Sequence, residues 1–240
     1  GGSLIRTEAT GYGLVYFLDS MLKVNNDTLQ GKTVLISGAG NVAQYAAEKA
    51  LHLGGKVITF SDSLGTLVDK EGFTQEKIDW VKAQKDARKP LSEYVAKFGG
   101  EWLEGQKPWQ FEAQVALPCA TQNEVSEADA QALVKLGVKY VAEGANMPLT
   151  AEAIDVVRAN GVAYAPGKAA NAGGVAVSGL EMSQNSVRQY KSFEELDEKL
   201  KNIMKNIHDN SLKAAQKYGT TEGAVDYMTG ANVAGFVQVA

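Results

Sequence analysis

The chain has 240 residues, of which 45% are hydrophobic and 22% charged, and its formal net charge at pH 7 is -4. This composition is typical of a soluble globular protein, and the length suits one large domain. Because the sequence has no basic stripe and no long apolar run, it favours neither nucleic-acid binding nor a membrane helix.

The first half of the chain begins with a pattern typical of a βαβ unit. Apolar residues at helical spacing are followed by the turn-forming cluster Asn25-Asn26-Asp27, and two β-branched runs then flank a second helical pattern. The turn-rich segment 61–72 is expected to be a loop. The predicted elements are a helix over 9–24, a strand over 32–37, a helix over 42–53 and a strand over 56–60.

The remaining elements continue the alternation of helices and strands. Pro90 separates two helical patterns, because proline disfavours helix at the residue before it. We predict helices over 74–87, 91–98, 126–136, 151–159, 172–189 and 193–218, and strands over 114–117, 140–142 and 162–165. Such alternation favours an α/β fold with a doubly wound, mostly parallel sheet and helices on both faces. With no internal repeat or linker, residues 1–240 are interpreted as a single domain.

The cysteine and the histidines carry little functional signal. Cys119 is the single cysteine and cannot build a disulfide framework, and no secretory signal pattern opens the chain, so we expect a cytoplasmic protein. Cys119 itself is interpreted as a small buried side chain. His52 and His208 have no partner at ligand spacing, so no metal site is expected. Both are interpreted as helix residues on partly solvated faces.

The segment Gly38-Ala39-Gly40-Asn41-Val42-Ala43 matches the G-x-G-x-x-A pattern of dinucleotide-binding (Rossmann-like) domains. It follows a predicted strand and opens a predicted helix, which is the context that the pattern requires. Gly38 permits a tight turn, Gly40 lets the backbone approach a diphosphate, and Ala43 allows close packing on the sheet. The free N–H groups at the helix start favour an anion, so Asn41 and Val42 are candidate cofactor residues.

The residues after the second predicted strand bear on the choice between NAD and NADP. Asp62 lies about twenty residues past the glycines, where an acid accepts hydrogen bonds from the ribose 2′-OH of NAD. Ser61 and Ser63 are good donors to the 2′-phosphate of NADP. The spacing alone leaves both cofactors open.

Six segments, in order along the chain and including the glycine pattern, resemble the hexameric glutamate dehydrogenases of bacteria and lower eukaryotes. The resemblance covers nearly the whole chain and departs at Thr7, where this family often has proline. The segments are Gly1–Leu4 with Arg6, Glu8–Gly13, Ser37–Gln44, Leu117–Glu124, Ala142–Pro148 and Ala165–Val175. The resemblance implies a cofactor domain, with the family's N-terminal substrate domain, which carries the catalytic lysines and aspartate, absent. No catalytic residue is therefore expected within these 240 residues.

The resemblance also implies individual roles. Thr10 is similar to a threonine at the nicotinamide end, although it also suits a helix N-cap. Asn171 belongs to a part that closes on the substrate, and Ser178 is similar to a serine that binds the glutamate side-chain carboxylate. Lys168 is given a structural or cofactor-adjacent role. The residues implied to line the nicotinamide-ribose side are Ala120, Thr121, Gln122 and Asn146, for the last of which an ordinary turn role is the alternative.

For the cofactor, the resemblance favours NADP over NAD. Ser61-Asp62-Ser63 is similar to the NADP-using branch, and Lys85 and Arg88 fall where that branch has cations near the 2′-phosphate. Exposed helix charges are the alternative interpretation of both cations. A cation at this place offsets Asp62 and stabilises a phosphate.

The implied activity of the longer enzyme is reversible oxidative deamination of L-glutamate to 2-oxoglutarate and ammonia, in a homohexamer. The 240-residue chain alone is expected to bind cofactor without turnover, as a monomer or weak dimer. Two alternatives remain: a domain of an NAD-preferring glutamate dehydrogenase or of another amino-acid dehydrogenase, and a non-catalytic dinucleotide-binding module.

Overall fold

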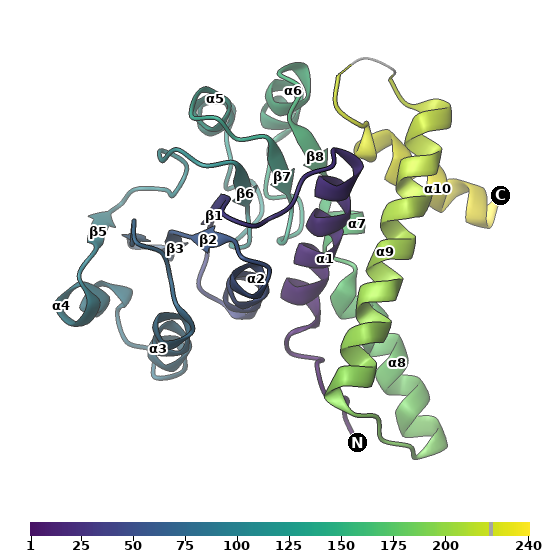
Figure 1. Ribbon diagram of the computed structural model, residues 1–240, viewed down its shortest axis with the longest axis horizontal. Helices are drawn as coiled ribbons and strands as arrows, with labels where there is room; N and C mark the ends of the chain where they lie inside the picture. The colour runs from purple at the N-terminus through teal and green to yellow at the C-terminus, as the bar shows by residue number, and fades with distance from the viewer. Residues whose placement is uncertain (221–222) are drawn as a thin grey trace.

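The computed structural model describes residues 1–220 and 223–240. Its centre is a five-stranded parallel sheet in the order β2-β1-β6-β7-β8 (Figure 1). Val34 pairs with Val57 on one side and with Val115 on the other, which fixes the register around the central strand. The strands are β1 (Thr33–Ile36), β2 (Lys56–Val57), β6 (Val115–Leu117), β7 (Tyr140–Ala142) and β8 (Ala163–Ala165). The predicted doubly wound parallel sheet is confirmed.

Both faces of this sheet are buried, and alternate residues of each strand enter two separate apolar clusters. Val34 and Ile36 of β1 join the cluster under the first helices, whereas Leu35 joins the cluster on the opposite face. The same alternation holds in β7, where Tyr140 and Val141 enter opposite clusters. Burial on both faces explains why the strands have short apolar runs without polar alternation.

Helices cover the two faces. On one face α1 (Ala9–Val24) lies against α2 (Asn41–His52), and the long α9 (Phe193–Tyr218) and α8 (Gly173–Val187) pack beside α1 (Figure 1). On the other face α5 (Glu127–Lys135) packs against α6 (Ala151–Ala159). All of these helices were predicted, with bounds that differ by no more than a few residues.

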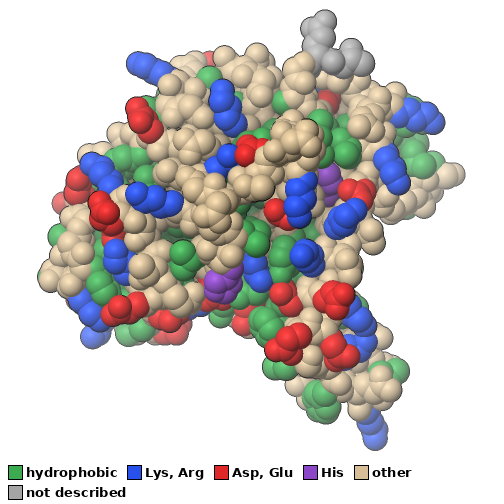
Figure 2. Space-filling model, in the orientation of Figure 1, with side chains coloured by type: hydrophobic (Ala, Val, Ile, Leu, Met, Phe, Trp, Pro, Cys, Tyr) green, Lys and Arg blue, Asp and Glu red, His purple; other side chains and the backbone are tan. Residues whose placement is uncertain are grey.

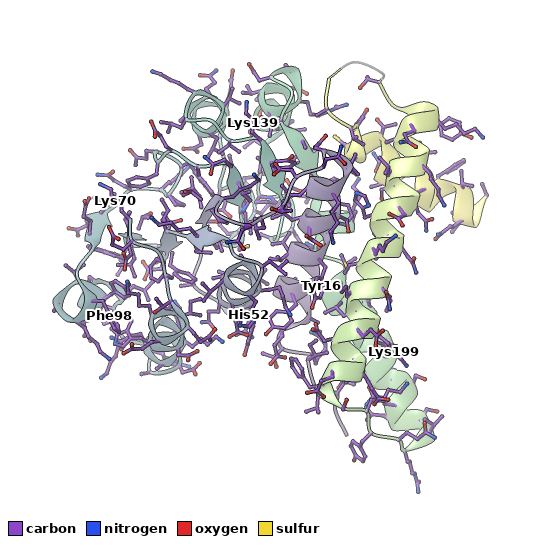
Figure 3. The ribbon with its side chains drawn as sticks, viewed as in Figure 1. Tyr16, His52, Lys70, Phe98, Lys139 and Lys199 are labelled. Atoms are coloured by element: carbon purple, nitrogen blue, oxygen red, sulfur yellow. The ribbon has the colours of Figure 1, made fainter. Side chains whose placement is uncertain are left out.

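A hydrogen bond connects α1 to α9, and a capping box defines where α9 begins. Tyr16 of α1 lies between α1 and α9 in Figure 3, and its hydroxyl donates to Asp197 of α9 at 2.6 Å. At the start of α9, Ser192 and Glu195 form a reciprocal capping box. This box explains why the helix begins at Phe193, as predicted.

A second, antiparallel sheet was not predicted. Its order is β3-β4-β5, and α3 (Gln75–Asp86), the 3-10 helix η1 (Leu91–Glu93) and α4 (Tyr94–Phe98) complete this part of the fold. The strand predicted over 56–60 is divided, since only β2 joins the parallel sheet, and the predicted loop 61–72 contains a strand. The strands are β3 (Thr59–Ser61), β4 (Gly65–Val68) and β5 (Glu101–Glu104).

Tight backbone packing explains why the turn-rich segment forms a strand. A Cβ at Gly65 would lie 2.4 Å from the carbonyl oxygen of Leu103 in β5, so the glycine allows the two strands to approach. An aromatic cluster behind the hairpin includes Phe60 and Phe73, whose rings meet edge to face at 4.8 Å. Glycine therefore acts here as a packing residue of the sheet and not as a loop signal.

Two helices and one histidine also differ from expectation. The chain contains α7 (Gly167–Ala170) and α10 (Tyr227–Val239), neither of which was predicted. His208 was expected on a partly solvated face, but it is only 2% exposed, and its Nε2 lies 2.9 Å from the Tyr227 hydroxyl of α10. This expectation was wrong because α10 covers that side of α9. His52 is exposed, in keeping with the expectation for it.

The surface carries charges of both signs. Lys and Arg side chains are intermixed with Asp and Glu across the face seen in Figure 2. Among the helices that the structure describes, none is long and apolar enough to cross a membrane.

Candidate cofactor site

The glycine turn after β1 has the conformation that its sequence demands. Gly38 has φ +80°, and a Cβ there would lie 3.0 Å from the carbonyl oxygen of Cys119. Its N–H donates to the hydroxyl of Ser61 at 2.8 Å, and the Ser61 N–H donates back to the Gly38 carbonyl at 3.0 Å. The turn is therefore held against the ends of both β3 and β6, where a side chain would be tightly packed and the backbone strained.

The start of α2 is open. Gly40 is the N-cap with extended backbone angles, and a Cβ built there would meet no atom within 4 Å. No described side chain caps the helix, in contrast to the capping boxes at α5 and α9. Asn41 is exposed and Val42 half-buried, while Ala43 is fully buried against the sheet. Uncapped N–H groups next to open space suit an anion, and Ala43 packs as the pattern predicted.

A cavity of about 500 Å³ lies beside this helix start, beyond the ends of β6 and β7. Doubly wound sheets bind ligands at this edge. It brings together many of the predicted residues from five separate segments, namely Thr10, Val42, Ala120, Thr121, Gln122, Asn146 and Asn171. Sequence reasoning assigned no role to other lining residues, which include Arg6, Gly144, Ala145, Gly174 and Val175.

The loop after β6 is held by a half-buried carboxylate. Glu124 accepts hydrogen bonds from the N–H groups of Ala120 (3.0 Å) and Thr121 (3.3 Å). Burial raises the pKa of Glu124, although a hydrogen bond from Ser37 and these two N–H groups oppose the increase. The Ser37 hydroxyl also accepts from the Cys119 N–H at 2.9 Å, which connects the loop to the end of β1. The cavity wall over 120–122 is thus a fixed surface.

Cys119 is buried, as expected. It lines the cavity, and burial together with the charge of Glu124 raises the pKa of its thiol well above the ordinary value. A thiol that stays protonated is a poor nucleophile. Cys119 is therefore a packing residue of the cavity wall.

Two asparagines form one wall of the cavity: Asn146 follows β7, and Asn171 follows α7. The side-chain amide of Asn171 donates to Asn146 Oδ1 at 2.9 Å and approaches the carbonyl oxygens of Gly144 and Ala145. Asn146 lies in a bend, as the alternative interpretation held, yet its side chain belongs to this pair and also lines the cavity.

At the other end of the site, Asp62 and Ser63 form the turn between β3 and β4. Asp62 Oδ1 accepts from the Leu64 N–H at 2.8 Å, so this carboxylate oxygen is used within the turn. Ser63 is exposed. Neither residue lines the cavity, but the hydrogen bonds between Ser61 and Gly38 place their turn directly after the glycine turn.

Contacts between α2 and α3 show where the two predicted cations lie. Lys82 in α3 bonds Glu48 and also lies over the ring of Tyr45, 4.4 Å from its centroid. Gln75, near the start of α3, bonds Glu48, whereas Lys82, later in α3, also reaches Tyr45, which is nearer the start of α2. The helix α3 therefore runs back toward the start of α2. Lys85 occupies the last turn of α3, and Arg88 follows it as an exposed residue with φ +54°. Arg88 is thus not on a helix face.

Ser178, which was assigned to the substrate side, lies in α8, one turn beyond the cavity residue Gly174. The Ser178 hydroxyl donates to the carbonyl oxygen of Gly174 at 3.0 Å, and Ser178 itself does not line the cavity. Thr10 is not the N-cap of α1, because Glu8 holds that position. A Cβ at Gly174 would lie 2.3 Å from Thr10 Oγ1, which explains why glycine is found where α8 meets α1.

Arg6 was missed as a site residue, although it lies in a segment that carries the family resemblance. It is exposed, lies 3.9 Å from the carboxylate of Glu181, and is the charged side chain among the cavity's described lining residues. Helical and strand periodicity contain no signal for such a residue, because it precedes α1.

A parallel sheet with a glycine turn, an open helix start and a cavity at the strand ends defines a Rossmann-like nucleotide-binding domain. Comparison with known proteins identifies the family. The family model for glutamate/leucine/phenylalanine/valine dehydrogenases matches residues 1–240. The chain therefore belongs to the glutamate/leucine/phenylalanine/valine dehydrogenase family.

Individual relatives are also similar. The chain is 64% identical to the NADP-specific glutamate dehydrogenase of Psychrobacter sp. (strain TAD1), covering 100% of this chain and 54% of the relative. It is 56% identical to the NADP-specific glutamate dehydrogenase of Giardia intestinalis, with 100% and 54% covered. The crystal structure of Plasmodium falciparum glutamate dehydrogenase superimposes with a TM-score of 0.96 at 45% identity, covering 100% of this chain and 51% of that one. The chain spans about half the length of the curated relatives it matches.

Proposed function

We propose that residues 1–240 form one domain, and that it is the NADP(H)-binding domain of a glutamate dehydrogenase. The observation that carries this proposal is the uncapped start of α2 above Gly40, beside a cavity at the ends of β6 and β7. Its N–H groups suit a diphosphate, and the cavity suits the nicotinamide ribose. The site residues are Thr10, Gly38, Gly40, Asn41, Val42, Asp62, Ser63, Lys85, Ala120, Thr121, Gln122, Asn146 and Asn171.

NADP is preferred over NAD in this proposal. Asp62 uses one oxygen to hold the Leu64 N–H, which reduces its capacity to bind a ribose hydroxyl. Lys85 lies at the end of α3 that approaches the start of α2, and exposed Ser63 is free to donate to a phosphate. The names of the relatives from Psychrobacter and Giardia support the same preference.

The activity proposed for the longer enzyme is reversible oxidative deamination of L-glutamate to 2-oxoglutarate and ammonia. NADP(H) when bound supplies the hydride chemistry, and the protein orients the reacting groups. The open helix start would hold the diphosphate, while Asn146, Asn171 and the loop over 120–122 would orient the ring face. Arg6 and Ser178, on the α1–α8 side, would face the substrate and exclude water as the cleft closes.

For the 240-residue chain alone, we expect cofactor binding without turnover. The cavity's described lining offers a cation at Arg6 but no carboxylate or lysine as general base. The homohexamer proposed for the longer enzyme would be assembled mainly through its other domain, so the chain alone should be a monomer or weak dimer. Light scattering that showed a stable hexamer would contradict this.

Calorimetric titration tests the function. NADPH should bind to the purified chain more tightly than NADH. In a separate assay, the chain mixed with oxidised NADP and L-glutamate should form no NADPH. Tighter NADH binding would favour the NAD alternative, and binding of neither nucleotide would overturn the proposal. Ser178 suits a substrate with a side-chain carboxylate, so we expect the full-length protein to use glutamate. Activity on leucine in place of glutamate would favour another amino-acid dehydrogenase.

A further inference from the structure

Glu143 is a buried carboxylate that lies behind the cavity and does not line it. It directly follows β7, and only 3% of the residue is exposed. One oxygen, Oε2, accepts from the Gly167 N–H at 2.7 Å, and the other, Oε1, accepts from the Leu149 N–H at 3.4 Å. Because an ionised carboxylate is costly to bury, such a group needs a specific reason to be there.

The contacts of Glu143 connect the two segments that present the asparagine pair. Gly167 begins α7, and the Gly167 carbonyl oxygen accepts from the Asn171 N–H at 2.9 Å at the other end of that helix. Asn171 then returns to the segment after β7 through its bond to Asn146 Oδ1 at 2.9 Å. The carboxylate therefore closes a ring that runs through α7, the asparagine pair and the segment 143–149.

Packing in this ring is close at Gly167. A Cβ at Gly167 would lie 2.9 Å from the Ala145 carbonyl oxygen and 3.2 Å from Asn171 Nδ2. Tyr164 lies beside the carboxylate, and burial together with the Glu143 charge raises the pKa of its phenol. Burial also raises the pKa of Glu143, while the hydrogen bonds from Gly167, Tyr164 and Leu149 oppose that increase. On its other side the ring borders a second cavity of about 670 Å³, which Glu143, Asn146 and Gly167 help to line. A change at Glu143 should therefore reach the asparagines through the hydrogen bonds of the ring and its contacts at Gly167.

We propose that Glu143 is a positioning residue that sets the orientation of Asn146 and Asn171 toward the nicotinamide-ribose half of the cofactor. It acts through the backbone of α7 and the segment 144–149, without touching the cofactor itself. This inference rests on the proposed function. It implies that Glu143 governs the nicotinamide half of the site and not the adenosine half, which lies near Ser61 and the end of α3.

Glu143→Gln tests this role. The glutamine side chain keeps one acceptor oxygen, but an NH₂ group replaces the other. Because NH₂ cannot accept, one of the hydrogen bonds from the Leu149 and Gly167 N–H groups is lost. We expect NADPH to bind about tenfold more weakly, which corresponds to roughly 1.4 kcal/mol. The probe 2′,5′-ADP has the adenosine, the 2′-phosphate and the 5′-phosphate but lacks the second phosphate of the diphosphate and the nicotinamide ribose. Its affinity for Glu143→Gln should therefore stay within about twofold of its affinity for the unchanged chain.

Gly167→Ala is the second variant, in case Glu143→Gln does not fold. It keeps the charge of Glu143 and displaces Ala145 and Asn171 from the other side, so it should show the same selective loss. Unchanged NADPH affinity in folded Glu143→Gln would overturn the inference, and so would an equal loss of NADPH and 2′,5′-ADP binding. If the unchanged chain binds neither probe, the proposed function itself fails.

Discussion

Ser61 and Gly38 exchange two hydrogen bonds across the site. The Gly38 N–H donates to Ser61 Oγ at 2.8 Å, and the Ser61 N–H donates to the Gly38 carbonyl at 3.0 Å. Ser61 ends β3 in the antiparallel sheet, whereas Gly38 follows β1 in the parallel one. The glycine turn is thus coupled directly to the segment that carries Asp62 and Ser63.

Ser61→Ala should destabilise the chain. It leaves the buried N–H of Gly38 without its acceptor, at a cost of about 1–3 kcal/mol in the free energy of unfolding. Urea unfolding followed by circular dichroism measures this change. Ser63→Ala is the matched control, because Ser63 is exposed and its loss should change stability by less than about 0.5 kcal/mol. Equal stability of the two variants would contradict the coupling.

Alanine at the two pattern glycines should have different effects. Gly40→Ala should fold normally, because φ is -82° and its Cβ meets open space, yet the added methyl group occupies the place proposed for the diphosphate. NADPH affinity should fall at least about tenfold, or roughly 1.4 kcal/mol. Gly38→Ala should instead lose stability by about 1–2 kcal/mol or more, because φ is +80° there.

Thermal unfolding and calorimetry on both variants separate the two effects. A Gly40→Ala chain that binds NADPH as tightly as the unchanged chain would show that the cofactor does not approach this backbone.

Removal of the positive charge at Lys85 should weaken NADPH binding selectively. Lys85→Gln should cost about fivefold in NADPH affinity, on the order of 1 kcal/mol, because a partly exposed charge acts through solvent. NADH lacks the 2′-phosphate and should bind Lys85→Gln and the unchanged chain equally. Lys135→Gln, which removes an exposed charge on α5, is the control. The loss should shrink at high salt; a similar loss for NADH would remove Lys85 from the phosphate site.

His208 should make stability depend on pH. Burial lowers its pKa from the ordinary value of 6.5, although Asp209 opposes this, so the folded chain favours the neutral imidazole. Below pH 6.5 the unfolded chain binds more protons, and stability is lost as the pH falls, by up to about 1.4 kcal/mol per pH unit. Urea unfolding between pH 7 and 5.5 should show this slope.

The two histidines allow a matched comparison. His208→Gln should flatten the slope, whereas His52→Gln should keep it, since His52 is exposed. A slope that His208→Gln leaves intact would assign the titration to another group.

Much of the fold could be predicted because its elements are local. The helix over 9–24 follows from apolar spacing alone, and the glycine pattern marks the turn after β1. The antiparallel sheet could not be predicted, because β4 depends on the close approach of Gly65 to Leu103, which are far apart in sequence. The burial of His208 was missed for the same reason, since it depends on α10.

The candidate site was predictable to a similar extent. The strand-end rule and the family resemblance indicated the loop over 120–122 and Asn146, and the cavity brings them together with Thr10. The bond between Ser61 and Gly38 and the ring closed by Glu143 depend on long-range contacts, which periodicity does not encode. Arg6 lies outside any regular element and carried no periodic signal.

The N–H groups at the start of α2 are proposed to hold the cofactor diphosphate. A crystal structure of the chain with NADP tests this most directly. We expect the diphosphate within hydrogen-bond distance of the Asn41 and Val42 N–H groups, over Gly40. A cofactor bound elsewhere, or this place empty or filled by a side chain at saturating NADP, would contradict the account.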